Sequence, residues 1–278
     1  MHKIVSFGKV ILAGSGCGDP ELITVKAARY LSEADLVITD RLVSKVILDT
    51  YVSSDTPIIY VGKQCKQKGS MKQENINELL VEYARDKKLI VRLKGGDTAF
   101  FSNILDELQT LTAAGIRYEI IPGITAASGA SAYAGIPLTA RGYATSVRFL
   151  TSYNDTVLED VYWKELANTT DTLVFYMSSN TIDLLVEKLK YFEISNDKKI
   201  AVISQATTPN QKIYIGSFDD YEAELKGETY LSPSLVIVGK VVGLHESFNW
   251  FNNKNTDEYY FKPVEELVQN VLPKQVIC

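Results

Sequence analysis

The sequence contains very few of the residues that build disulfide frameworks or metal centres. Its 278 residues include three cysteines, Cys17, Cys65 and Cys278, and two histidines, His2 and His245. The cysteines are odd in number and far apart, so they suggest neither a disulfide framework nor a zinc site. Two histidines cannot form a histidine-rich metal site. We therefore expect a protein that binds no metal.

The sequence also lacks long apolar runs and an excess of positive charge. The N-terminal segment has no small-residue cleavage site and no apolar stretch long enough to span a bilayer. The net charge of −5 argues against a broad nucleic-acid-binding surface. Hydrophobic residues make up 46% of the chain, which is typical of a globular protein. We expect a cytoplasmic protein that binds neither membranes nor nucleic acid.

Short apolar runs alternate with helical patterns along the first part of the chain. A short apolar run indicates a buried strand, and apolar residues three and four positions apart indicate a helix. Strands are expected at 9–13, 35–39, 57–61, 89–93 and 118–121, and helices at 20–34, 73–86 and 105–114. This alternation predicts an α/β unit whose sheet is mainly parallel, with helices on its faces.

A second series follows Pro122-Gly123, where two residues that interrupt regular structure fall together. Strands are expected at 147–151, 172–176, 199–203 and 234–238, with a helix at 181–190 and an antiparallel edge strand at 211–215. The predicted fold class is two α/β domains with mainly parallel sheets. The predicted domains are 1–122 and 123–251, followed by a surface tail, 252–278, with a weak helical pattern at 264–271.

A glycine-rich turn joins the first expected strand to the first expected helix. It reads Gly14-Ser-Gly-Cys-Gly-Asp-Pro20, and Asp40 lies at the end of the second expected strand. Glycines let a backbone approach a ligand closely, and an acid at this spacing imitates the ribose-binding acid of a dinucleotide fingerprint. Position 19 is Asp where the fingerprint has its third glycine. A dinucleotide-dependent dehydrogenase and a purely structural turn are therefore alternatives at this point.

Two further segments strengthen the case for a ligand. Lys94-Gly-Gly-Asp97 follows the expected strand 89–93, so it should lie on the same sheet edge as the first turn, where open α/β sheets bind ligands. Asp97 can accept hydrogen bonds from ribose hydroxyls, or it can cap the next helix. The segment Thr125–Ala132 consists of small residues, which let a helix approach another element or a flat ligand closely.

Together these motifs resemble those of the uroporphyrinogen-III C-methyltransferases, within the tetrapyrrole methylases. The matching segments, in family order from about residue 9 to 245, are GSGCGDPELITVKA, TDRLVS, VGK, RLKGGD, PGITAASGASAYAGIPLTARG, TLVFYMS and SPSLVIVGKVV. The resemblance implies two α/β domains with a ligand cleft between them, a homodimer, S-adenosyl-L-methionine as methyl donor and no metal. It implies C-methylation of uroporphyrinogen III to precorrin-2, for siroheme or cobalamin biosynthesis.

By resemblance, the methyl donor contacts residues from each of these motifs. They are Cys17 in the first turn, Gly95, Gly96, Asp97 and Phe100 in and after the second, Thr125 and Ala126 in the small-residue segment, Met177 after the strand 172–176, and Ala206. Cys17 and Thr98 stand where the family usually has proline. Both changes remove backbone stiffness rather than a hydrogen-bonding group.

The resemblance also implies the groups that move protons. A pyrrole carbon that accepts a methyl group becomes cationic, so a base must remove a proton. Asp40, in Thr39-Asp-Arg-Leu-Val-Ser44, matches the family's base, and Lys63, in Val61-Gly-Lys63, matches its proton donor. The alternatives are a helix N-cap for Asp40 and a solvated loop cation for Lys63.

A substrate with many carboxylates needs cations, and arginine binds carboxylates bidentately. We expect Arg41, Arg141 and Arg148 to bind the substrate. The other cations at predicted strand or loop ends are Arg92 and the run of Lys63, Lys66, Lys68 and Lys72.

One departure from the family pattern bears on the substrate. Asn103 stands where the family has an arginine between glycines, and that arginine is implied to bind or activate the substrate. Two alternatives therefore accompany the uroporphyrinogen activity. One is a sister methyltransferase acting on a later corrin precursor, and the other is a catalytically weak protein that binds the donor or a tetrapyrrole.

Overall fold

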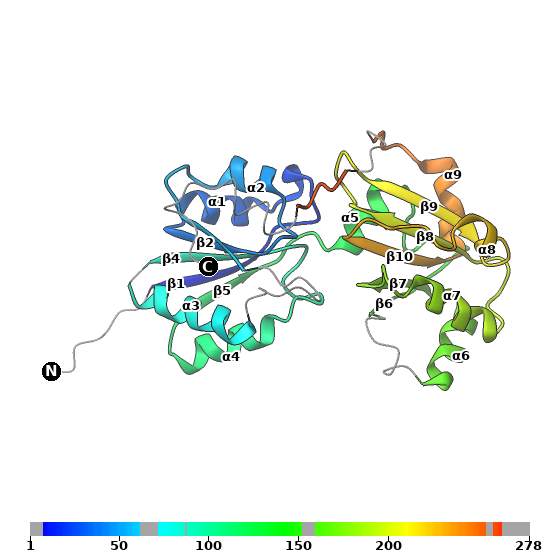
Figure 1. The fold of residues 1–278 in the computed structure, drawn as a ribbon, viewed down its shortest axis with the longest axis horizontal. Helices are drawn as coiled ribbons and strands as arrows, with labels where there is room; N and C mark the ends of the chain where they lie inside the picture. Colours follow the sequence, from blue (N-terminus) through cyan, green and yellow to red (C-terminus); the bar gives the residue numbers. More distant parts are fainter. Residues whose placement is uncertain (1–7, 62–71, 87, 152–158, 254–257, 263–278) are drawn as a thin grey trace. The chain divides into compact units, whose positions relative to one another are not determined.

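The computed structural model describes residues 8–61, 72–86, 88–151, 159–253 and 258–262, and it divides into two compact units (Figure 1). The first unit comprises the chain up to Thr125 and again from Phe261, and the second comprises Ala126–Tyr260. Each contains one five-stranded sheet. The domain limits predicted at 122 and 251 stay predictions, because compactness alone does not define an independently folding domain.

The first unit is a parallel α/β sheet in the strand order β3-β2-β4-β1-β5, as the alternating pattern predicts. Its elements are β1 (Lys9–Gly14), η1 (Pro20–Leu22), α1 (Val25–Glu33), β2 (Leu36–Thr39), α2 (Lys45–Tyr51), β3 (Ile58–Tyr60), α3 (Gln73–Arg85), β4 (Leu89–Lys94), α4 (Ile104–Ala113) and β5 (Arg117–Ile121).

Helices cover both faces of this sheet. Helices α1 and α2 lie on one face, and α3 and α4 lie on the other (Figure 1). The alternating residues of β1 therefore enter two separate cores, Ile11 with α1 and α2, and Leu12 with α3 and α4. A strand buried on both faces has a continuous apolar sequence, which is why these strands are visible in the sequence.

The helix expected at 20–34 is divided in two. Asp19 caps a short turn, η1, through a hydrogen bond from the Glu21 N–H, and the chain is then extended at Thr24. Thr24 caps α1 by accepting a hydrogen bond from the Ala27 N–H. The helical apolar spacing before Thr24 was misleading because a second capping residue restarts the helix there.

The second unit has the strand order β6-β7-β10-β8-β9. Its elements are α5 (Ala126–Tyr133), β6 (Val147–Thr151), α6 (Asp160–Asn168), β7 (Thr172–Tyr176), α7 (Ile182–Tyr191), β8 (Lys199–Ser204), β9 (Lys212–Ser217), α8 (Tyr221–Glu224), β10 (Ser234–Gly239), η3 (Lys240–Leu244) and α9 (His245–Phe248). Helices α6 and α7 pack on one face of the sheet, and α5 with η3 packs on the other.

The expectation of a mainly parallel sheet holds for the first unit and not for the second. Only β6 and β7 pair in parallel, whereas β10 runs antiparallel to both β7 and β8, and β9 is the predicted antiparallel edge strand. The sequence of β10, Ser-Leu-Val-Ile-Val-Gly, is buried on both faces. Burial on both faces gives the same apolar run whichever way a strand points.

The small-residue segment forms α5, as expected. Ala127 and Ala130 are fully buried against the second sheet. The weak helical pattern at 264–271 lies outside the described residues. Within the described ranges, no helix is both long and apolar enough to cross a membrane.

Candidate active site

Three glycine turns meet at the carboxyl-terminal edge of the first sheet. Gly16 and Gly96 exchange two backbone hydrogen bonds, of 3.0 and 2.7 Å. A β-carbon on Gly14 would lie 2.6 Å from the Gly96 carbonyl oxygen, and one on Gly123 only 2.3 Å from it. Backbone this close leaves no room for side chains, so the expectation that the first two turns share one edge is confirmed.

Asp97 holds this arrangement together. Its Oδ1 accepts a hydrogen bond of 2.7 Å from the Ala99 N–H, and its Oδ2 accepts one of 2.7 Å from the Gly123 N–H. Helix α4 begins at the N-cap Asn103, so the capping role considered for Asp97 is wrong. Each carboxylate oxygen keeps a second lone pair, which a ligand hydroxyl can still use.

A cavity of about 230 Å³ opens beside the second glycine turn, entirely within the first unit. It is formed where β2, β3 and β4 end, and by the start of α3 and the loop before α4. Its lining residues are Asp40, Arg41, Leu42, Val61, Gln73, Ile76, Arg92, Lys94, Gly95, Phe101, Ser102 and Asn103. Asp40, the predicted base, and Arg41, a predicted substrate-binding residue, therefore both line this cavity.

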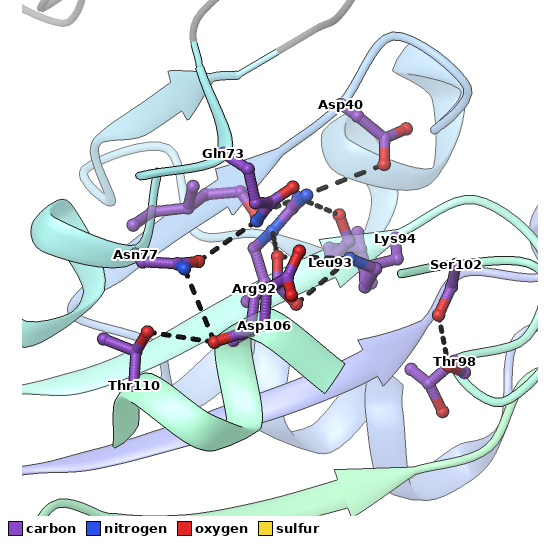
Figure 2. A network of polar contacts seen from close by, with 12 residues as sticks. Asp40, Gln73, Asn77, Arg92, Leu93, Lys94, Thr98, Ser102, Asp106 and Thr110 are labelled. Carbon is purple, nitrogen blue, oxygen red and sulfur yellow. Dashed lines mark hydrogen bonds and ion pairs between the residues drawn. The ribbon is translucent and has the colours of Figure 1, made fainter. Parts of the chain in front are cut away.

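A charge cluster includes Arg92, Lys94 and Asp40, which line the cavity, and a buried acid behind them (Figure 2). The carboxylate of Glu107 is fully buried, and it accepts hydrogen bonds from Arg92 Nε at 3.0 Å and from Lys94 Nζ at 3.0 and 3.1 Å. Arg92 Nη1 donates to the Leu93 carbonyl oxygen at 3.1 Å and lies 4.0 Å from Asp40 Oδ2. Arg92 thus connects the buried Glu107 to the more exposed Asp40.

The cluster changes the acidity of Lys94. Burial lowers the pKa of the Lys94 ammonium group, and the positive charge of Arg92 lowers it further, while Glu107 acts in the opposite direction. The cluster has no net charge, because the positive charges of Arg92 and Lys94 equal the negative charges of Glu107 and Asp40. Glu107 is the critical member, because its removal would leave two buried cations uncompensated.

Asp40 is not a helix cap. Its Oδ1 accepts a hydrogen bond of 3.0 Å from the Leu42 N–H, which closes a tight turn after β2. Helix α2 is capped instead by Ser44, whose side chain accepts from the Ile47 N–H. The other carboxylate oxygen of Asp40 lies 4.0 Å from Arg92 Nη1, and the residue lines the cavity; its role as a base stays a prediction.

The loop that bears Asn103 has an unusual backbone. Phe101 and Asn103 both have φ of 53°, in the left-handed region that few residues other than glycine and asparagine adopt readily. This conformation explains why an asparagine is tolerated at position 103. The same loop exposes 40% of Phe100 and of Phe101, beside the polar wall of the cavity.

The predicted donor residues of the second unit share one edge of the second sheet. Met177 follows β7 and Ala206 follows β8, and both strands end beside the start of β10, where Leu235 pairs with Tyr176 and Ser234 with Ser204. The start of α5 reaches the same edge, because the Ala127 N–H donates to the Tyr176 hydroxyl at 3.1 Å. Three segments far apart in the sequence are thus brought together.

The same edge contains two buried hydroxyls. Ser204 Oγ and Ser234 Oγ are buried and have no hydrogen-bond partner among the described residues. Buried polar atoms normally have partners. A third hydroxyl of this kind, Thr172 Oγ1, lies at the opposite end of β7, so these atoms do not by themselves identify a ligand site.

The remaining predicted cations have different surroundings. Arg148 lies at the start of β6, where Glu165 and Asp171 hold its guanidinium group, at the opposite end of β7 from Met177. Its substrate role stays a prediction, and these ion pairs favour a structural one. Arg141 is exposed in a turn closed by Ala140 and Ala144. The predicted proton donor Lys63 lies outside the described residues, as do Lys66 and Lys68.

The comparisons with known proteins agree with this architecture. The family model described as Tetrapyrrole (Corrin/Porphyrin) Methylases matches residues 9–222. The chain belongs to the tetrapyrrole methylase family. Among curated relatives of this methylase, the siroheme synthase of Vesicomyosocius okutanii subsp. Calyptogena okutanii is 42% identical over 247 residues, which are 89% of this chain and 53% of the relative. The methylase thus spans about half the length of that protein.

Solved structures support the same family assignment. The uroporphyrin-III C-methyltransferase of Thermus thermophilus, in complex with S-adenyl homocysteine, is 32% identical with a TM-score of 0.70, covering 85% of this chain and 100% of that one. A cobalt precorrin-4 methyltransferase of cobalamin biosynthesis is 25% identical with a TM-score of 0.75, covering 84% of this chain and 95% of that one.

Two members of the charge cluster were not identified from the sequence of the methylase. Lys94 appeared there only as the start of a glycine turn, and Glu107 as part of a helix. The signal was the pair of charges in the strand Leu89-Ile-Val-Arg-Leu-Lys94, which is otherwise apolar and buried. Buried charges need partners, so an acid nearby in space was required. Among the described residues, no group of acids, cysteines or histidines is arranged to hold a metal ion.

Proposed function

We propose that this methylase transfers methyl groups from S-adenosyl-L-methionine to two ring carbons of uroporphyrinogen III, giving precorrin-2 for siroheme or cobalamin biosynthesis. The observation that carries the proposal is the cavity at the sheet edge, where Asp40 and Arg41 face the close-packed glycine turns. The similarity to the Thermus thermophilus enzyme supports both the substrate and the donor. We further propose a cytoplasmic homodimer that contains no metal.

The residues present suit the donor. The glycine turns offer backbone without side chains, which lets a ligand approach closely. The residues proposed to contact the donor are Cys17, Gly95, Gly96, Asp97, Phe100 and Thr125 in the first unit and Ala126, Met177 and Ala206 in the second.

The chemistry then assigns a role to each polar group. When bound, the donor supplies a methyl group on a sulfonium, which a ring carbon attacks in line from about 3 to 3.5 Å. The carbon–methyl bond forms as the sulfur–methyl bond breaks, and the pyrrole gains the positive charge. Asp40 removes the ring proton, and Arg92 keeps its carboxylate directed into the cavity. Lys63 is the proposed proton donor, and Arg41, with Arg141, is proposed to bind substrate carboxylates.

The test is the mass of the product formed from uroporphyrinogen III and isotopically labelled S-adenosylmethionine. We expect a product that carries two labelled methyl groups. A product with no label from this substrate, together with labelling of a later corrin precursor, would replace the proposed substrate by that precursor. If the protein bound the donor but transferred no methyl group, we would conclude that it is a binding protein and not an active methyltransferase.

A sister methyltransferase is the second candidate, and Asn103 favours it. Asn103 is short and neutral, and it lines the cavity where the family has an arginine. It cannot make a bidentate contact with a carboxylate. The similarity to the cobalt precorrin-4 methyltransferase agrees with this candidate as well.

A further inference from the structure

The loop between β8 and β9, residues 205–211, has a backbone that its own sequence does not favour. Gln205 and Thr207 have φ of 51° and 64°, in the left-handed region, although neither is glycine. Such residues keep this conformation only where the surrounding structure enforces it, and they are common at ligand-binding sites. Some other part of the second unit must therefore hold the loop.

Three buried amide side chains do so. Gln211 accepts a hydrogen bond of 2.8 Å from the Thr207 N–H and donates one of 3.3 Å to the carbonyl oxygen of Tyr133, at the end of α5. Asn210 donates to the carbonyl oxygen of Glu258 at 3.2 Å. The loop is thus attached both to α5 and to a segment about fifty residues further along the chain.

Gln205 makes the firmest attachment to that later segment. Its side chain is fully buried; Nε2 donates to the Glu258 carbonyl oxygen at 3.0 Å, and Oε1 accepts from the Tyr260 N–H at 2.6 Å. The backbone of residues 258–260 thus provides a hydrogen-bond partner for both the NH₂ group and the oxygen of the Gln205 side chain. The conformation at the start of the loop therefore depends on a segment that the sequence suggested to be a surface tail.

The same residue lies at the edge where the donor is proposed to bind. The Gln205 N–H donates to the Pro233 carbonyl oxygen at 2.7 Å, next to the unpartnered hydroxyls of Ser204 and Ser234. Ala206, a proposed donor contact, is the next residue. We propose that Gln205, held by the backbone of Glu258 and Tyr260, is a positioning residue for the methyl donor, and that residues 258–260 are a structural part of the donor site. This inference rests on the proposed function.

Loss of the two hydrogen bonds between the Gln205 side chain and the backbone of Glu258 and Tyr260 should weaken binding of the methyl donor and not of the tetrapyrrole. Without them, the backbone at Gln205 and Thr207 relaxes, and Ala206 moves from the position that donor binding requires. Donor affinity should fall, whereas the Michaelis constant for the tetrapyrrole, measured at saturating donor, should stay the same. A residue that only stabilised the fold would change neither constant selectively.

The experiment uses the full chain and two variants that share the loss of the hydrogen bond from the Tyr260 N–H to Gln205 Oε1. Gln205→Met keeps the side-chain volume but removes the amide, and Tyr260→Pro removes the backbone N–H. Calorimetric titration with S-adenosylhomocysteine measures donor affinity, and thermal unfolding measures stability. We expect each variant to bind about tenfold more weakly, the effect of about 1.4 kcal/mol, and the double variant to bind little more weakly than Gln205→Met, which already lacks the shared bond.

Lys198→Met is the matched control. Lys198 is also buried and donates to two backbone carbonyls, those of Ala167 and Thr169, at the other end of β8, about 20 Å away. It should lower the unfolding temperature and leave the affinity for S-adenosylhomocysteine unchanged.

Three outcomes separate the ideas. Selective loss of affinity in the Gln205 and Tyr260 variants supports the positioning role. Wild-type affinity in either folded variant, with only the stability loss of the control, overturns it and leaves the proposed function intact. If the wild-type chain itself fails to bind S-adenosylhomocysteine at millimolar concentration, the proposed function fails, and the positioning role fails with it.

Discussion

At the scale of single residues, Glu107 is the centre of the buried charge cluster beside the cavity. It is fully buried and faces two cations, Arg92 and Lys94, that come from one strand. A buried pair adds little net stability compared with an apolar pair, but loss of one partner is costly because the other charge stays buried. Glu107 therefore affects both the stability of the first unit and the orientation of Arg92 toward Asp40.

We predict that Glu107→Gln destabilises the protein by about 3 to 5 kcal/mol and reduces methyl transfer. A neutral amide leaves Arg92 and Lys94 buried beside each other, so the pKa of Lys94 should fall further below its ordinary value. Denaturant unfolding and initial rates measure the two effects. Asp106→Asn is the control, since it makes the same change at the next residue, whose side chain is exposed. Equal stability of the two variants would contradict this account of the cluster.

We predict that Asp40→Asn lowers the turnover number by about 10²- to 10⁴-fold and leaves donor affinity nearly unchanged. The change preserves size and removes only charge and basicity. Single-turnover rates and calorimetry with S-adenosylhomocysteine measure the two quantities. Asp49→Asn is the matched control, because Asp49 is an exposed acid on α2 that pairs with Lys45. If Asp40→Asn retained near-full turnover, Asp40 would not be the base, and its role would be limited to closing the tight turn after β2.

The sequence located these residues with unequal success. Asp40, Arg41 and the two glycine turns were placed on one edge correctly, because strand ends in a parallel sheet share that edge. Glu107 was not identified, because a helical position does not reveal which buried charge it will face. Excluding a helix cap at Asp40 also required the structure, since caps and bases both occur directly after a strand.

At the scale of elements, an ion-pair network joins α1 to β1 and the edge strand β5. Glu119 on β5 accepts hydrogen bonds from Lys26, from Lys9 at 2.6 Å and from Tyr30 at 2.7 Å. These three donors, Lys26 first, lower the pKa of Glu119 from 4.5 to about 2. The network lies away from the cavity, so its effects concern stability.

We predict that this network makes stability depend on pH in the acid range. The pKa of Glu119 is lower in the folded than in the unfolded chain, so its contribution is fully present above about pH 4.5 and is lost as the pH falls toward 2. The stability difference between wild type and Glu119→Gln should therefore shrink across that range, measured by urea unfolding at each pH. Glu33→Gln, which removes an exposed pair with Arg29, should show a smaller difference. A difference that is constant from pH 2 to pH 5 would exclude the ion-pair origin.

Most elements were predicted within a few residues, and the exceptions share a cause. Helices α2, α6, α8 and α9 and the turn η3 were not predicted, and η1 and α1 were merged. Capping and packing, rather than apolar spacing, decide where short helices begin. Strand β10 was predicted at the right position, but its direction depends on the strands between which it is inserted.

At the scale of the whole molecule, each unit has its own core and its own share of the proposed site. The cavity, the charge cluster and the glycine turns belong to the first unit. Met177, Ala206 and the loop held by Gln205 belong to the second. The residues proposed to form the site are thus divided between two separately packed sheets.

By itself, the sequence determined the family, the two α/β units, the positions of most strands and the glycine turns. These depend on short-range periodicity and on ordered motifs, which a chain carries before it folds. The tertiary structure decided which buried charges pair, which way β10 runs and which distant segment holds the loop 205–211. Those outcomes depend on groups that are far apart in the sequence and meet only when the sheets pack, since a buried polar group accepts whichever partner the fold brings within hydrogen-bonding distance.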